Sequence, residues 1–135
     1  TTDNKKQSDE LIHIQKQLLI LGSQLASEGS TNPISPLETA DVDFIEQAID
    51  RMTAQLAVLR NFVIPGGDPL VSYAHLARCV CRRAEREMTK LREKEKVAKL
   101  AIIYINRLSD YFFTLSRKFA QDCQVEEIKW IPSRK

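Results

Sequence analysis

The sequence has few of the residues that mark secreted or metal-bound scaffolds. It holds three cysteines in 135 residues, and two of them, Cys79 and Cys81, would point about 200° apart on a helix. An odd number of cysteines in this arrangement argues against both a disulfide framework and a zinc site. We therefore expect reduced thiols in an intracellular protein.

The sequence also lacks long apolar runs and any strong excess of charge. No stretch approaches the roughly 20 apolar residues of a membrane span, and the polar beginning does not resemble a signal peptide, so no membrane association is expected. The net charge of +2 comes without basic runs interleaved with aromatic residues, which argues against nucleic acid as a partner. With 43% hydrophobic and 28% charged residues, residues 1–135 are expected to form one compact domain.

Apolar residues at spacings of three and four predict four helices, and no segment shows the alternation typical of a strand. The first helix is expected from about Ser8 to Ala26. The second should open with Ser35 as N-cap, Pro36 at the first position and Glu38 completing a capping box. Its apolar stripe continues towards the Pro-Gly-Gly run at residues 65–67, which ends it. The stripes of the two helices consist of Leu11, Ile14, Leu18, Leu21 and Leu25, and of Val42, Ile45, Ile49, Met52, Leu56 and Leu59.

The third and fourth helices are expected over about Pro69–Lys94 and Lys96–Gln121. Residues 100–105 of the fourth are apolar on every side, which is typical of a central helix surrounded by others. The sequence therefore predicts an all-α antiparallel helical bundle. The apolar surface of the fourth helix must be buried by more than the other three helices, either by another subunit or by a further segment. We therefore expect an oligomer. The stripe predicted for the third helix is Leu70, Ala74, Ala77, Cys81, Ala84, Met88 and Leu91.

Arginines flank that stripe in register on one side of the third helix. Arg78, Arg82 and Arg86 follow each other at four-residue intervals, with His75 one turn earlier. Like charges at this spacing repel and would weaken an isolated helix. The pattern indicates a candidate anion site. The alternative is a solvated flank held by salt bridges within the helix, such as Arg82 with Glu85 or Arg83 with Glu87.

Polar residues interrupt the apolar fourth helix at Asn106, Ser109 and Asp110. A buried amide or carboxylate without a partner costs a few kcal/mol, so each of these side chains needs a hydrogen bond. Two interpretations stay open at this point: they lock the fourth helix to a neighbour, or they face a ligand.

Four segments in order resemble the PduO-type ATP:cob(I)alamin adenosyltransferases. They are residues 62–67 (FVIPGG), 75–78 (HLAR), 81–86 (CRRAER) and 105–111 (INRLSDY), with weaker similarity from about Leu11 to the closing EIKW at 127–130. The resemblance covers most of the chain. It departs from the family pattern at the start, because the Thr/Gly/Asp-rich ATP loop and the first helix that precede this region in the family are absent from residues 1–10.

The resemblance implies a ferritin-like, five-helix bundle whose first helix is missing here, assembled as a homotrimer with ATP and the corrinoid at subunit interfaces. It implies transfer of the 5'-deoxyadenosyl group from ATP to the cobalt of cob(I)alamin, with release of tripolyphosphate. Cob(I)alamin is itself a strong nucleophile, so the protein needs no catalytic serine or cysteine. Its task would be to align the C5' carbon and neutralise the leaving triphosphate.

Residue roles follow from the matching positions. By the family pattern Arg82 and Arg86 would contact phosphates and act in catalysis, with Arg83 and Glu85 in the same nucleotide-binding turn and Asn106 near the nucleotide. Arginine suits this task because its guanidinium group binds phosphate oxygens in pairs. Glu85 would either orient an arginine or help to hold the Mg²⁺ that accompanies ATP.

Phe62 would be the corrin-side residue, an apolar wall that displaces the lower axial ligand of cobalt and so assists its reduction. Without the resemblance, Phe62 would be interpreted as an apolar contact that closes the loop after the second helix. The resemblance also implies a cytoplasmic or mitochondrial-matrix protein, with a cobalamin reductase or a B12-dependent mutase as further partner. The alternative functions are a nucleotide-deficient relative that binds a corrinoid or a partner, and an unrelated helical adaptor whose arginines bind an acidic surface.

Overall fold

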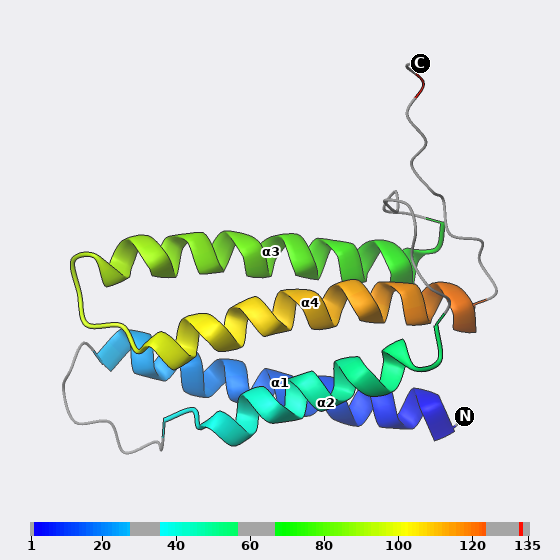
Figure 1. Cartoon of the computed structure of the whole chain (residues 1–135), viewed down its shortest axis with the longest axis horizontal. Helices are drawn as coiled ribbons and strands as arrows, with labels where there is room; N and C mark the ends of the chain where they lie inside the picture. The colour runs from blue at the N-terminus through cyan, green and yellow to red at the C-terminus, as the bar shows by residue number, and fades with distance from the viewer. Residues whose placement is uncertain (1, 28–35, 57–66, 124–132, 134–135) are drawn as a thin grey trace.

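The protein is described by a computed structural model covering residues 2–27, 36–56, 67–123 and 133. These residues contain four helices and no strand: α1 (Thr2–Ser27), α2 (Thr39–Thr53), α3 (Pro69–Arg92) and α4 (Lys99–Asp122). Consecutive helices run antiparallel, and α4 lies between α3 on one side and the α1–α2 pair on the other (Figure 1). The all-α antiparallel bundle is thus confirmed, while the fifth helix and the trimer stay predictions.

The predicted starts of the first two helices are wrong. α1 begins at Thr2 rather than Ser8. α2 begins one turn later than expected, with Glu38 as N-cap, and the carboxylate of Asp41 accepts the Glu38 backbone N–H at 2.8 Å. A capping box therefore forms at residues 38 and 41, because acidic side chains satisfy free N–H groups at a helix start as well as serine does. Ser35 lies outside the described residues.

The predicted end of α2 is also wrong within the described part of the chain. The helix stops at Thr53, and residues 54–56 form a turn; Leu59 lies outside the described residues. The bounds of α3 and α4 agree with the prediction to within a turn. α3 starts at Pro69 because the Asp68 side chain accepts the Leu70 N–H at 2.9 Å and proline suits the first position.

The core lies along α4, as predicted for a central helix. Tyr104, Leu108 and Tyr111 are fully buried, and they pack with buried residues of the three other helices. The apolar turn at the start of α4 is covered only in part, since Leu100 and Ile102 are half-buried and Ile103 is exposed. In the described parts of the chain no helix is long and apolar enough to cross a membrane.

The buried face of α3 differs from the predicted stripe at both ends. Ala74, Cys81 and Met88 are buried at seven-residue intervals, but Leu70 and Leu91 are exposed. Val71 and His75 are buried instead. A seven-residue repeat drifts by about 20° per heptad around a straight helix. Residues that share a face with the middle of the stripe therefore turn away from the core towards the ends of α3, where neighbouring positions are buried instead.

A buried polar cluster that the sequence pattern did not predict joins three helices. Glu10 of α1 is buried, pairs with Arg51 of α2 and accepts a hydrogen bond from the Tyr111 hydroxyl of α4 at 3.3 Å. Burial raises the pKa of Tyr111 to about 12, so its phenol stays protonated and available as the donor. The cluster shows how a carboxylate can be buried when its oxygens find partners.

Candidate functional site

A cleft of about 640 Å³ opens between α3 and α4. α3 contributes the side that carries Arg78, Arg82 and Arg86, and α4 contributes the polar residues that interrupt its apolar pattern. The residues that line it are Arg78, Arg82, Glu85, Arg86, Thr89, Lys90, Asn106, Ser109 and Asp110. The packing of the two helices therefore joins the two polar features that the sequence presented separately.

The arginines of α3 do not form the salt bridges proposed as an alternative to an anion site. No carboxylate in the described parts of the chain pairs with Arg82, Arg83 or Arg86, and Glu87 contacts Lys90 at 3.5 Å. Arg82 and Arg86 are exposed to solvent at the cleft wall. An unpaired guanidinium group keeps its donors available for an anion.

Arg78 is held differently from the two arginines that follow it. Its guanidinium carbon lies 5.2 Å from the centre of the Phe113 ring, a cation–π contact between α3 and α4. His75, one turn earlier, is buried and meets the edge of the same ring, with centroids 6.4 Å apart. Burial, and then the charge of Arg78, lower the pKa of His75, so this imidazole is neutral beside the arginines.

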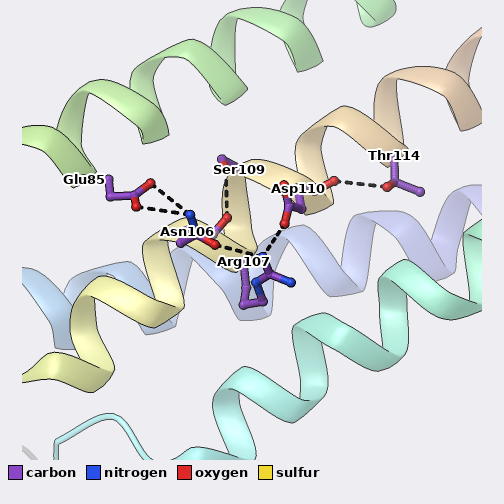
Figure 2. Close-up of polar contacts among 6 residues, drawn as sticks. All are labelled: Glu85, Asn106, Arg107, Ser109, Asp110 and Thr114. Carbon is purple, nitrogen blue, oxygen red and sulfur yellow. Dashed lines mark hydrogen bonds and ion pairs between the residues drawn. The ribbon is translucent and has the colours of Figure 1, made fainter. Parts of the chain in front are cut away.

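Asn106 joins the two walls of the cleft. Its side-chain amide donates to both carboxylate oxygens of Glu85, at 3.1 and 3.3 Å (Figure 2). The two interpretations of Asn106 are therefore compatible, because it bonds to the neighbouring helix and also lines the cleft. The same contact accounts for Glu85, whose carboxylate is directed to α4 rather than to Arg82.

Arg107 extends this chain of contacts along α4. Its guanidinium group donates to the Asn106 side-chain oxygen at 2.8 Å and pairs with Asp110 at 2.7 Å (Figure 2). Ser109 and Thr114 bond to backbone carbonyls of their own helix, at residues 106 and 110. Sequence reasoning gave Arg107 no role, although its three-residue spacing from Asp110 is the spacing of a helical ion pair.

The cleft carries an excess of positive charge. Arg78, Arg82, Arg86 and Lys90 face it against the carboxylates of Glu85 and Asp110, and Asp110 is already paired with Arg107. Lys90 and Thr89 were missed by the sequence analysis, although Lys90 continues the four-residue spacing of the arginines by one turn. Such an excess on one concave wall favours a ligand with several negative charges.

The predicted site residues divide into three groups. Arg82, Glu85, Arg86 and Asn106 line the same cleft. Arg83 is exposed on α3 and does not line it, and Phe62 lies outside the described residues. No group of three potential metal ligands occurs among the side chains that the structure describes.

Both the sequence and the fold of this chain match proteins of one family. The family model for cobalamin adenosyltransferases matches residues 1–119. The corrinoid adenosyltransferase of Bacillus subtilis is 39% identical over 108 residues, which are 80% of this chain and 55% of that protein. The corrinoid adenosyltransferase of Citrobacter freundii is 39% identical over 110 residues, 80% of this chain and 62% of that protein. The chain thus spans little more than half the length of these relatives.

Solved structures agree with the sequence comparison. A variant of the PduO-type adenosyltransferase from Lactobacillus reuteri, complexed with ATP, superposes with a TM-score of 0.88 at 31% identity and covers 97% of this chain and 74% of that one. Another variant of the same enzyme, complexed with cobalamin and ATP, gives a TM-score of 0.85 at 33% identity, covering 93% and 70%.

Proposed function

Since the chain belongs to the cobalamin adenosyltransferase family, we propose that the protein transfers the 5'-deoxyadenosyl group of ATP to the cobalt of cob(I)alamin or a related corrinoid and releases tripolyphosphate. The observation that carries this proposal is the cleft between α3 and α4, where Arg82 and Arg86 stand side by side without carboxylate partners in the described chain. A triphosphate is the multiply charged ligand that such a wall suits.

In this reaction the protein has two tasks, to position the substrates and to stabilise the charge on the leaving group. The Co(I) electron pair attacks C5' of ATP, a carbon–cobalt bond forms, and the C5'–O bond breaks with its electrons leaving on tripolyphosphate. Negative charge therefore builds on the phosphate side of the reacting carbon. In this proposal Arg82 and Arg86 stabilise that charge with paired N–H donors, while cobalt itself supplies the nucleophile.

The other cleft residues take supporting roles in the proposal. Asn106 and Glu85 lie at the nucleotide, with Arg83 in the same turn of α3. Mg²⁺ usually keeps several waters and binds through phosphates with one or two carboxylates, and the described residues hold no cluster of three ligands. This donor set suits a Mg²⁺ ion held chiefly by ATP. A ligand role for Glu85 stays a prediction, since it requires exchange of an Asn106 contact for the metal.

Assembly and corrinoid binding belong to the same proposal. We infer a homotrimer with ATP and the corrinoid at subunit interfaces, and Phe62 as the residue on the corrin side. Support for assembly comes from α3, where Tyr73, Leu76 and Val80 are 66%, 61% and 59% exposed on its N-terminal half. Three large apolar side chains on one stretch of helix are typical of a surface that meets another chain.

We propose the cellular setting from the state of the cysteines. Cys79, Cys81 and Cys123 are all free thiols in the structure, which suits a reducing compartment. We place the protein in the cytoplasm, with the mitochondrial matrix as the alternative. A cobalamin reductase that delivers the electron, or a B12-dependent mutase that accepts the product, would be its partner.

An anaerobic assay tests the function directly. Chemically reduced cob(I)alamin and MgATP are mixed with the protein, and the absorbance change that accompanies a light-sensitive carbon–cobalt bond is followed. Turnover that needs both substrates and releases tripolyphosphate is expected. Arg82→Ala should reduce it strongly, whereas Arg92→Ala, which removes an exposed arginine outside the cleft on the same helix, should not.

The outcomes separate the enzyme from its alternatives. Stabilisation by MgATP without turnover would indicate a relative that binds its substrates but does not catalyse, because a ligand that binds the folded state raises its unfolding temperature. Corrinoid binding without any response to MgATP would indicate a nucleotide-deficient relative. A folded protein that responds to neither would contradict the proposal, and its arginines would then serve a partner with an acidic surface.

A further inference from the structure

We propose that Arg107 is a positioning residue for the anion cleft, acting through Asn106 and Glu85 rather than on the ligand. By holding the Glu85 carboxylate on α4, it keeps Arg82 and Arg86 open to phosphate. This inference rests on the proposed function, because the benefit of open arginines is the binding of a triphosphate. Arg107 acts in three steps: it orients Asn106, Asn106 holds Glu85, and Glu85 then leaves Arg82 unpaired.

The first step is the orientation of the Asn106 amide. An asparagine side chain has an accepting oxygen at one end and a donating nitrogen at the other. Arg107 donates to the oxygen at 2.8 Å, so the nitrogen must point the opposite way, towards α3. The guanidinium group is itself anchored by Asp110 at 2.7 Å, and it does not line the cleft. Figure 2 shows the amide between Arg107 and Glu85.

The second step is the capture of Glu85. The oriented nitrogen donates to both carboxylate oxygens, at 3.1 and 3.3 Å. With the amide reversed, the Asn106 oxygen would face the carboxylate, and two acceptors would repel. The contact between α3 and α4 therefore depends on which end of the amide Arg107 holds.

The third step is the effect on the arginines. Glu85 follows Arg82 by three residues on α3, the spacing at which an acid and a base on one helix face can pair. Such a pair would have to break before Arg82 could bind phosphate. The contact with Asn106 prevents it, which agrees with the exposed and unpaired state of Arg82 and Arg86 among the described residues.

A purely structural role for Arg107 fits the geometry less well. The side chains of Arg107 and Asp110 are 38% and 51% exposed, and exposed ion pairs add little to the stability of a fold. Among the described residues, Arg107 also bonds only within its own helix, to residues one and three positions away. What it controls across the helices is the direction of one amide.

The first test examines conformation without ligand. Crystal structures of the intact protein and of Arg107→Met are compared, with Arg92→Met as the matched control. In Arg107→Met we expect Glu85 to leave Asn106 and to approach Arg82 within ion-pair distance. An unchanged contact between Glu85 and Asn106 would overturn the inference. If Arg107→Met does not fold, Arg107→Lys is used. It should weaken the hold because both contacts come from Nη2 at the far end of the guanidinium group, a position that the shorter lysine side chain does not reach in the same geometry.

The second test is a double-mutant cycle on tripolyphosphate binding, measured by calorimetry. Arg107→Met should weaken binding about tenfold, a factor within the usual range for coupled neighbours. In a Glu85→Gln background, where the Glu85 carboxylate no longer competes for Arg82, the same change should weaken binding by less than about twofold. Equal factors in the two backgrounds would show that Arg107 acts independently of Glu85, and would contradict the inference.

Failure of the proposed function gives a different result. If the unaltered protein binds neither tripolyphosphate nor MgATP, the nucleotide site is wrong. The position of Glu85 in the Arg107→Met structure still decides whether Arg107 orients Asn106.

Discussion

Replacement of Arg82 offers the sharpest test of the cleft. Its guanidinium group is exposed and has no carboxylate partner among the described residues, so its removal should cost little folding stability. If it makes two hydrogen bonds to phosphate, each contributing about 1.5 kcal/mol, Arg82→Ala should lose about 3 kcal/mol of transition-state stabilisation. At about 1.4 kcal/mol per decade, kcat/KM should fall roughly 150-fold.

Lysine at the same position separates charge from geometry. Arg82→Lys keeps the positive charge but offers one ammonium group in place of the planar fork, so it should retain one of the two contacts. We expect kcat/KM about tenfold below that of the unaltered protein, a loss of about 1.4 kcal/mol. The assay is adenosyl transfer to cob(I)alamin under anaerobic conditions, with unfolding temperature measured in parallel and Arg92→Ala as control.

Two results would refute this reasoning. One is a kcat/KM for Arg82→Ala equal to that of Arg92→Ala, which would mean that Arg82 does not contact the reacting nucleotide. The other is a large drop in unfolding temperature that accounts for the lost activity, which would mean that Arg82 supports the fold through contacts the described chain does not contain.

Three further predictions concern the fold. Leu108→Ala empties a fully buried site and should lower the free energy of unfolding by about 2–5 kcal/mol in urea titrations; a smaller loss would contradict its central place. Because the pKa of buried His75 is lowered, the unfolded chain binds a proton below about pH 6.5 that the folded protein does not bind. The free energy of unfolding should therefore fall from pH 7 to pH 5, and His75→Leu should make it less dependent on pH. Burial raises the pKa of Cys81 to about 11, so iodoacetamide at pH 8 should alkylate exposed Cys79 and spare Cys81; equal labelling of the folded protein would count against its burial.

Capping residues predicted the start of a helix correctly where the sequence allowed only one start. Asp68 followed by Pro69 can start a helix in one register, and α3 begins there. For α2 the sequence predicted a capping box that begins at Ser35, whereas the structure has one that begins at Glu38, one turn later. Residues that cap equally well cannot be separated by local chemistry, so the boundary depends on how the helix packs.

The sequence showed that arginines lie along one side of α3, but it did not show whether they are paired with carboxylates. At three residues from Arg82, Glu85 has a good local partner, and sequence spacing alone cannot exclude that pair. Packing of α3 against α4 brings the Asn106 amide within 3.1 Å of Glu85, across 21 residues of chain. Hydrogen bonds between distant segments depend on helix rotation and crossing, which a one-dimensional pattern does not contain.

Taken by itself, the sequence determined the helical bundle, the central position of α4 and the run of arginines beside the buried stripe of α3. These features follow from periodicity and side-chain type. Tertiary structure decided which polar groups meet. It paired Glu10 with Arg51 and with Tyr111, 101 residues further along the chain, and it turned Glu85 away from Arg82. Burial makes such pairings obligatory, and only the folded chain brings the partners within reach.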